Sequence, residues 1–308
     1  MGNATGFLDL QVNGYGGVDL NQDHLKPDDL HALCERLEAD GVAGILATFT
    51  TESLEKMERR MANLVAHREK DPLAERIIVG IHIEGPFISP TDGYRGAHPA
   101  DAVRPPNTDE MKRLLDAAGG LARVVTLAPE CDEGQRLVRM LVGQGIIASA
   151  GHCDAPLDAL RAAIDAGLSM FTHLGNGCAN GVHRHDNIIE RALSLYERLW
   201  LCFIADGVHV PFFALGNWLR GIDLAHAAVV TDAVTPAGLG PGVYAHGRHR
   251  IQVAENDAAR LMDGSLVGGA ITMRQAAENL VREVGLSDED ARRLTVTNPR
   301  RAIGLDVS

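Results

Sequence analysis

The chain has 308 residues, of which 45% are hydrophobic and 23% charged, as in an ordinary globular protein. Its formal net charge of −12 argues against a nucleic-acid-binding face, which would need a basic surface. No apolar run of about 18 residues occurs, so we expect no membrane span and no membrane partner.

The N-terminal segment and the cysteines indicate a compartment. The first ten residues, MGNATGFLDL, lack the charged region and apolar stretch of a signal peptide. Five cysteines occur, an odd number without a C-x-x-C pair, so we expect no disulfide framework. These features predict a cytoplasmic protein.

Segments typical of buried strands recur along the chain. They are short and apolar on both faces, as in RIIVGIHIEG and AHAAVVTDAV, which is typical of parallel strands covered on both sides. The expected strands lie at 6–14, 44–50, 76–85, 121–130, 145–152, 169–176, 199–210 and 225–234.

Helical patterns separate these strands. At 52–70 and 156–166, apolar residues recur at steps of three and four, which gives one apolar stripe on a helix. Two more helices are expected at 272–284 and 287–294. Asn107 and Ser287, each with an acidic residue three positions later, resemble helix-starting capping boxes.

The alternation of strands and helices predicts right-handed βαβ units. We expect them to close into a (β/α)8 TIM barrel of the metal-dependent hydrolase type. An open doubly wound sheet is the alternative, although the turn NGYGG lacks the G-x-G-x-x-G spacing of a dinucleotide site. Residues 236–269 are polar and rich in glycine, with one strand-like piece at 250–253, and we expect them to lie over the barrel mouth. We expect a single catalytic domain over 1–308.

Polar residues interrupt the apolar runs at the C-terminal ends of seven of the eight expected strands. Active sites of such barrels lie at these ends. The residues are Gln11, Asn13, Glu84, Glu130, His152, His173, His209 and Asp232.

Three of these residues form a candidate metal site. Catalytic zinc commonly takes three ligands of the His and Glu type and leaves one position for water. Glu84, His152 and His173 supply this set from three strands that converge on the barrel axis. The alternative for any single buried histidine is a core residue that is hydrogen-bonded to a backbone carbonyl.

Other residues suit catalysis or substrate binding. Asp232 could accept a proton from water and pass it to a leaving amine, or it could cap the following turn. His98 and His209 could bind substrate or polarise a carbonyl, although His98 could also be a solvated loop residue. Arg184, between two histidines, suits phosphate recognition, or it lies in a solvated loop.

Several short motifs occur in an order found in a known family. They are GFLDLQVNGYGG, HIEGPF, SAGHCDA, THLGNG, IADGVHV, VVTDAV, DGSLVGG and the closing VTNPRRAIGLD. Over nearly the whole chain they resemble the N-acetylglucosamine-6-phosphate deacetylases of the amidohydrolase superfamily. The resemblance implies hydrolysis of the N-acetyl group of an amino-sugar phosphate, with release of acetate.

The resemblance also implies roles for individual residues. Glu84, His152 and His173 match the metal ligands, Asp232 matches the general base and acid, and His98 matches a histidine that polarises the substrate carbonyl. The positions that match substrate-binding residues are His209, Asn176, Gly177, Arg184 and Val267.

The expected cofactor is one divalent metal ion. We expect Zn2+, with Fe2+ or Mn2+ as alternatives, because these ions share such ligands. Gln11 and Asn13 stand where many amidohydrolases have H-x-H, and amides are poor zinc ligands, so we expect one tightly bound ion. The expected assembly is a homodimer that acts on a small amino-sugar substrate and binds no nucleic acid.

Two features depart from the family pattern. We expect a barrel-only form that lacks the small β-sandwich usually found with the barrel in this family. The segment after Thr172-His173-Leu174 reads Gly-Asn-Gly-Cys, where the family has Tyr-Asn-Ala-Met. Three other functions therefore stay open, namely an amidohydrolase for unphosphorylated N-acetyl sugars, N-acyl amino acids or cyclic amides, an inactive sugar-binding barrel, and an isomerase.

Overall fold

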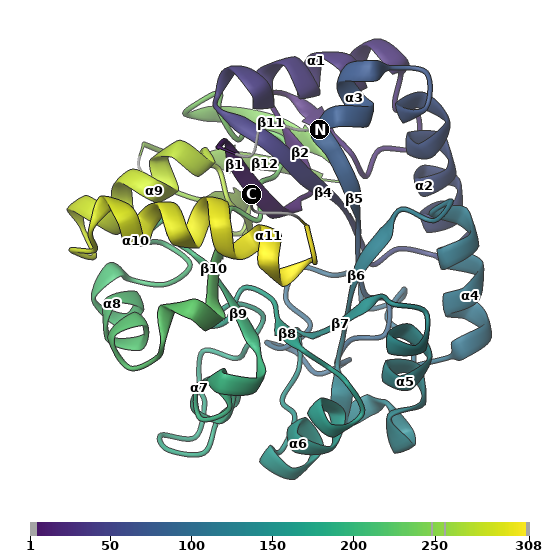
Figure 1. The fold of residues 1–308 in the computed structure, drawn as a ribbon. Helices are drawn as coiled ribbons and strands as arrows, with labels where there is room; N and C mark the ends of the chain where they lie inside the picture. The colour runs from purple at the N-terminus through teal and green to yellow at the C-terminus, as the bar shows by residue number, and fades with distance from the viewer. Residues whose placement is uncertain (1–4, 248, 256, 306–308) are drawn as a thin grey trace.

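The computed structural model describes residues 5–247, 249–255 and 257–305. Its main sheet has eight parallel strands in the order β1-β4-β5-β6-β7-β8-β9-β10, so each strand pairs with the next one along the chain (Figure 1). A doubly wound sheet would reverse its order at a switch point. The unreversed order therefore confirms the predicted barrel.

Each predicted strand corresponds to one strand of the barrel, and seven of the eight contain it, whereas the second strand begins two residues before the predicted range 44–50. The strands are β1 (Phe7–Val12), β4 (Val42–Thr50), β5 (Ile78–Glu84), β6 (Ala122–Leu127), β7 (Ile147–Ala150), β8 (Met170–Phe171), β9 (Trp200–Ile204) and β10 (Ala227–Val230). At 169–176, the observed strand covers only two residues. The backbone leaves the extended conformation there, because His173 takes a left-handed φ of 29°.

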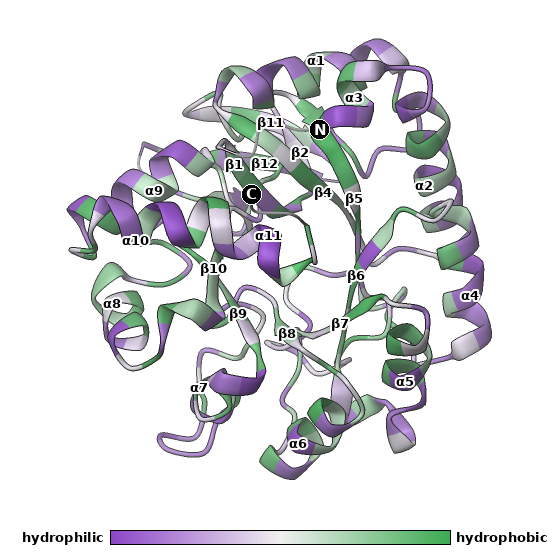
Figure 2. Ribbon diagram, viewed as in Figure 1, coloured by the Kyte–Doolittle hydropathy of each residue, from purple (hydrophilic) through white to green (hydrophobic). Residues whose placement is uncertain are grey.

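Helices cover the outside of the barrel. They are α1 (Pro27–Ala39), α2 (Leu54–Arg68), α3 (Pro72–Ile77), α4 (Thr108–Ala117), α5 (Arg136–Gly143), α6 (Leu157–Asp165), α7 (Ile188–Leu193), α8 (Phe212–Arg220), α9 (Met273–Arg282), α10 (Asp288–Arg292) and α11 (Asn298–Ala302). Strands are coloured mostly as hydrophobic in Figure 2, whereas the helices carry both colours, as expected of helices with one buried face. Asn107 and Ser287 cap α4 and α10 as predicted. No helix in the described part of the chain is long and apolar enough to cross a membrane.

The barrel closes between β10 and β1 with few ladder bonds. Val12 and Ala233 form an isolated parallel bridge, and the backbone N–H of Asn13 donates to the carbonyl of Ala233 at 2.7 Å. Lower in the same seam, the buried Asp9 carboxyl accepts hydrogen bonds from the backbone N–H and the hydroxyl of Thr231. A side chain thus supplies part of the bonding that the ladder lacks.

The last helix closes the N-terminal end of the barrel. Ala302 and Ile303 pack against apolar side chains of the barrel interior, including Leu8 and Leu46. Asn298 Nδ2 donates to two carbonyls beside the start of β10, at 2.6 and 2.7 Å. This leaves the opposite, C-terminal end for a ligand.

The segment 236–269 forms a small antiparallel sheet over that opposite end. Its strands are β11 (Gly242–His246), β12 (His249–Val253), β13 (Ala259–Leu261) and β14 (Leu266–Gly268). The sequence revealed only the strand-like piece inside β12. The others were missed because they are short and have one polar, exposed face. The parallel bridge between Ala233 and Gly269 attaches this sheet to the end of the barrel.

Candidate active site

The candidate catalytic side chains lie just beyond the strand ends. Glu84 is the last residue of β5, and His152, His173 and Asp232 follow β7, β8 and β10 by two residues. His152, His173 and Asp232 have φ angles of 49°, 29° and 51°, and Gln135 is the one further non-glycine residue with positive φ in the described part of the chain. Such backbone costs roughly 1–3 kcal/mol per residue and clusters at functional sites.

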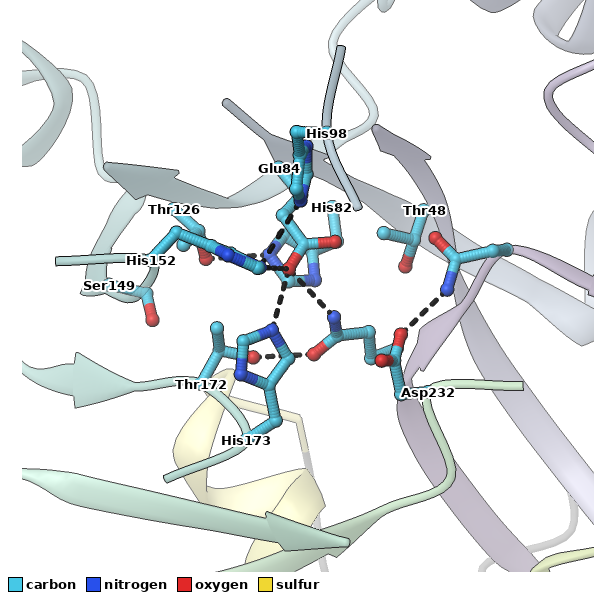
Figure 3. A network of polar contacts seen from close by, with 12 residues as sticks. Thr48, His82, Glu84, His98, Thr126, Ser149, His152, Thr172, His173 and Asp232 are labelled. Atoms are coloured by element: carbon cyan, nitrogen blue, oxygen red, sulfur yellow. Dashed lines mark hydrogen bonds and ion pairs between the residues drawn. The ribbon is translucent and has the colours of Figure 1, made fainter. Parts of the chain in front are cut away.

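One oxygen of Glu84 is the centre of this cluster (Figure 3). His173 Nε2 lies 2.8 Å from Glu84 Oε1, and His152 Nε2 lies 3.2 Å from the same oxygen. Gln11 Nε2 donates to this oxygen at 3.0 Å. The structure therefore brings the three predicted metal ligands together, and all three are buried.

The hydrogen bonds of His152 fix which nitrogen faces this centre. Nδ1 of His152 lies 3.0 Å from the backbone carbonyl of Tyr94, so it carries the proton. In the neutral ring, Nε2 then presents a lone pair to the Glu84 oxygen, and two lone pairs repel unless a cation or proton lies between them. Histidine ligands of metals commonly donate their other N–H to a carbonyl in this way.

His98 adds a further nitrogen to the same centre. Its Nε2 lies 3.2 Å from His152 Nε2. The donor atoms of Glu84, His98 and His152 all lie within 4.8 Å of one another. Burial, followed by the neighbouring His152, lowers the pKa of His98 to about 3, so this ring is neutral. A carboxylate with imidazoles is a ligand set that Zn2+, Fe2+ and Mn2+ accept, and the residues fit a divalent cation.

Asp232 faces this cluster as a strong candidate base. Asn13 Nδ2 donates to its Oδ1 at 2.7 Å. Burial, with the negative charge of Glu84 as the second cause, raises the pKa of Asp232 to about 8. An acid that gains and loses its proton near neutral pH suits general acid–base catalysis.

Two amides, one in β1 and one directly after it, orient the two acids. Gln11 lies in β1, and Asn13 follows its last residue, Val12. Gln11 donates to Glu84, and its carbonyl oxygen accepts a hydrogen bond from the Thr172 hydroxyl at 2.5 Å, which fixes the amide orientation. Asn13 donates to Asp232. Both amides thus act as hydrogen-bond donors toward the acids.

A pocket opens over these groups between the barrel and the small sheet. The residues that line it include Glu84, His98, His152 and Asp232 as well as the predicted substrate-binding residues Asn176, His209 and Val267. Val267 comes from β14, so the small sheet forms part of the wall.

Two predicted substrate-binding residues do not line this pocket. A Cβ atom at Gly177, where φ is +59°, would lie 2.8 Å from Nδ1 of His152, so this glycine makes room for the ring. Arg184 is exposed on the segment between β8 and α7. Glu130, one of the polar strand ends, accepts a hydrogen bond from the backbone N–H of Asp154 at 2.7 Å, also outside the pocket lining.

Sequence reasoning missed several residues at or beside the pocket. Arg60 on α2 and the buried Glu52 line the pocket, and Arg60 Nε donates to Asp23 Oδ1 at 2.8 Å. Arg60 lies within a helix, whereas Glu52 follows the end of β4 by two residues, the same spacing as His152 after β7, and was a usable signal. Asp206 bonds His209 across the spacing D-x-x-H, which was a usable signal inside IADGVHV.

Comparisons with known proteins identify relatives across nearly the whole chain. No family model matches. The chain is 32% identical over 302 residues to N-acetylglucosamine-6-phosphate deacetylase of Bacillus subtilis, covering 97% of this chain and 75% of that protein. It is also 32% identical over 308 residues to N-acetylgalactosamine-6-phosphate deacetylase of a Shewanella species, covering 97% of this chain and 74% of that protein.

Comparison with solved structures finds the same kind of protein. A variant of N-acetyl-D-glucosamine-6-phosphate deacetylase from Mycobacterium smegmatis, in complex with N-acetyl-D-glucosamine-6-phosphate, superimposes with a TM-score of 0.88 at 32% identity. The match covers 98% of this chain and 77% of that one. A TatD family hydrolase from Entamoeba histolytica, with a TM-score of 0.56 at 11% identity, shares the fold alone.

Proposed function

The chain belongs to the family of N-acetylglucosamine-6-phosphate deacetylases, and from this membership we propose how its pocket works. It hydrolyses the N-acetyl group of an amino-sugar 6-phosphate to the free amine and acetate. The observation that carries the proposal is the buried acid Asp232 facing the cluster of Glu84, His152 and His173 in one pocket.

Glu84, His152 and His173 are the proposed ligands of one divalent metal ion. His173 is preferred over His98 as the third ligand because its Nε2 lies 2.8 Å from the Glu84 oxygen and its backbone is held at the end of β8. A bound divalent ion would acidify water and polarise the acetyl carbonyl. We propose Zn2+, with Fe2+ or Mn2+ as alternatives. One ion is proposed because Gln11 and Asn13 are amides.

Asp232 is the proposed general base and acid. Its carboxylate accepts a proton from the attacking water and then delivers that proton to the amide nitrogen, which leaves as the amine. Asn13 holds the carboxylate in place through Oδ1, so Oδ2 is the oxygen that handles the proton. The neutral His98 ring is placed to donate a hydrogen bond to the carbonyl oxygen as negative charge develops on it.

The remaining pocket residues are proposed to hold the sugar. His209, Asn176 and Val267 line the wall, and Gly177 gives His152 the space that it needs. The small sheet contributes Val267, so we propose that barrel and sheet act as one catalytic domain. We also propose a homodimer. Phe213 on α8 is 76% exposed, and sedimentation of the pure protein at several concentrations would reveal a monomer if this is wrong.

Arg184 is the proposed anchor for the phosphate. Its guanidinium makes no ion pair or hydrogen bond with other described residues, whereas Arg60 is paired with Asp23 and lies 3.9 Å from Glu52. Replacing Arg184 with alanine should raise KM for the phosphorylated sugar by roughly 10–100-fold, the loss of a charged hydrogen bond, with little change in kcat. An unchanged preference for the phosphorylated sugar would move the anchor to Arg60, which an Arg60→Gln variant would then show.

Measuring acetate release from three sugars tests which substrate the protein hydrolyses. The metal-loaded protein is given N-acetylglucosamine 6-phosphate, N-acetylgalactosamine 6-phosphate and unphosphorylated N-acetylglucosamine. Faster release from a 6-phosphate than from the free sugar is expected, and the two phosphates identify the preferred sugar. Release from none of the three would contradict the proposal and would point to another amide substrate.

A further inference from the structure

The pocket extends to two opposite sides of the barrel mouth. On one side, Asn176 follows β8, the sixth strand of the barrel, and His209 follows β9, the seventh. The other side follows β4, the second strand, and Figure 1 shows β4 and β8 across the barrel from each other. The pocket residues on the β4 side, which we call the second arm, are Asn21, Thr50, Thr51, Glu52 and Arg60.

The second arm begins directly beside the metal cluster. Thr50, the last residue of β4, pairs with Glu84, the last residue of β5. The Thr51 hydroxyl donates to the backbone carbonyl of Glu84 at 3.3 Å. Glu52 follows and is buried. Since two residues of chain span at most about 7 Å, Glu52 lies within reach of a short chain that starts at the cluster.

Two cations lie beside the Glu52 carboxylate. Its Oε1 accepts a hydrogen bond from the backbone N–H of Ser53 at 2.9 Å, and Lys56 Nζ lies 3.3 Å from Oε2. Arg60 Nη2 lies 3.9 Å from the same oxygen, while Arg60 Nε donates to Asp23 at 2.8 Å. The Arg60 side chain is only 9% exposed. The guanidinium is therefore held beside Glu52 at a distance longer than a hydrogen bond.

The separation between Arg60 and Glu52 suits a hydroxyl group of a ligand. Polar atoms more than about 3.5 Å apart can be bridged by an O–H group. The hydroxyl oxygen accepts from the guanidinium, and its O–H donates to the carboxylate. A ligand carboxylate would be repelled by Glu52, and a ligand ammonium would be repelled by Arg60. A neutral hydroxyl fits both partners.

The geometry of an amide determines which part of the substrate enters the second arm. The sugar is bonded to the amide nitrogen, whereas the acyl chain is bonded to the carbonyl carbon, so the two extend in opposite directions. The proposed site places the carbonyl at the metal cluster and the sugar against Asn176 and His209. The acyl chain then points toward β4 and the second arm.

We propose that the second arm binds the acyl chain, and that Glu52 and Arg60 make the protein hydrolyse N-acyl groups that are longer than acetyl and end in a hydroxyl. This inference rests on the proposed function, because it takes the sugar to lie against Asn176 and His209. The bond changes are those of deacetylation. The water oxygen, with one of its hydrogens, bonds to the acyl carbon, the C–N bond breaks, and the nitrogen takes the other proton. The products are a hydroxy acid and the amine.

Three derivatives of glucosamine 6-phosphate test the inference, with acetyl, butanoyl or 4-hydroxybutanoyl on the nitrogen. Release of the free amine by the metal-loaded protein gives kcat/KM for each. The value for 4-hydroxybutanoyl should exceed that for butanoyl by roughly 10–100-fold, the effect of a hydrogen bond to a charged group. This comparison uses the wild type and needs no variant.

Glu52→Gln tests the residue that reads the hydroxyl. The variant keeps the shape of the side chain and an oxygen for the Ser53 N–H, but its NH2 group replaces the charged acceptor. The ratio of the two kcat/KM values should fall at least about fivefold. Glu55→Gln is the matched control, because Glu55 lies on the same helix, pairs with Arg113 and has an exposed side chain outside the pocket lining. Its ratio should equal that of the wild type.

Several results would overturn the inference. Equal kcat/KM for butanoyl and 4-hydroxybutanoyl in the wild type would show that no hydroxyl is recognised, and no hydrolysis of either would close the second arm to acyl chains. A ratio that survives in Glu52→Gln would place the recognition elsewhere. A preference for phosphate that is lost in Arg60→Gln would place the sugar in the second arm. Failure of the proposed function would instead appear as a wild-type protein that releases no acetate from N-acetylglucosamine 6-phosphate.

Discussion

Three residues of the proposed site have a strained backbone. His152, His173 and Asp232 all adopt left-handed φ angles, which are unfavourable for residues with a Cβ atom. The strain turns each side chain over the end of its strand. A residue needed only for packing would not require this unfavourable φ angle. We therefore infer that the backbone strain at these positions indicates function.

Asp232→Asn tests the acid–base role at the level of one atom. The amide keeps the shape of the side chain but cannot accept the proton, so kcat should fall by roughly 10²–10⁴-fold. Metal content should stay that of the wild type, because Asp232 is not a proposed ligand. Acetate release and elemental analysis measure the two quantities. Activity near that of the wild type would remove Asp232 from the reaction.

Gly177→Ala tests the fit around His152. A Cβ atom there would lie 2.8 Å from His152 Nδ1, the atom that donates to the Tyr94 carbonyl, and φ at this position is +59°. The displaced ring should lower metal affinity by roughly 10–100-fold, as the loss of a ligand's supporting contacts does. Competition with a chelating dye measures the affinity.

The control for this variant is Gly181→Ala. A Cβ atom at Gly181 would meet no atom within 4 Å, so metal affinity should be unchanged. Equal metal affinity in the two alanine variants would contradict the packing argument.

At the level of elements, the seam between β1 and β10 depends on a buried acid. Burial raises the pKa of Asp9 to about 7, although hydrogen bonds from Thr231 and from the backbone of Gln11 oppose the shift. The folded pKa lies above the ordinary value of 3.8. The stability from Asp9 is therefore full below about pH 4 and is lost as pH rises through about 7.

Asp9→Asn should remove this dependence. The asparagine oxygen can keep the bonds to the backbone N–H groups, and the NH2 group can donate to the Thr231 hydroxyl. Between pH 5 and pH 8, the wild type should lose about 3 kcal/mol of unfolding free energy relative to the variant. Urea unfolding at both pH values measures this difference. A constant difference between the two proteins would show that Asp9 does not titrate in this range.

The small sheet and the last helix cover opposite ends of the barrel. Asn298 and the apolar residues after it seal the N-terminal end, while β11 to β14 cover part of the C-terminal end and supply Val267 to the pocket. The pocket therefore lies at the C-terminal end of the barrel, where His152, His173 and Asp232 have positive φ angles.

At the scale of the whole molecule, the sequence was sufficient to predict the barrel and the convergence of Glu84, His152 and His173. Apolar runs that end in Glu84, His152 and His173 predict both strand direction and convergence, because parallel strands of a barrel share one C-terminal edge. The ranges of β8 and β9 were overestimated, since the turn after each strand depends on backbone angles that composition does not encode.

The pocket walls were harder to predict. Arg60 reaches the pocket from the second turn of α2, and the strands β11, β13 and β14 have weak sequence patterns. Such residues become neighbours only through tertiary packing. The opposite holds for Arg184, which the family resemblance predicts as a substrate-binding residue. Its side chain is exposed and is not among the residues that line the pocket.

We propose that one divalent ion, held by Glu84, His152 and His173, supports removal of the acetyl group. The most direct measurement strips the protein with a chelator and follows acetate release from N-acetylglucosamine 6-phosphate while Zn2+ is added back. We predict that activity is lost on stripping and returns fully at one equivalent of metal per chain. Activity that survives complete removal of metal, or that needs two equivalents, would contradict this account.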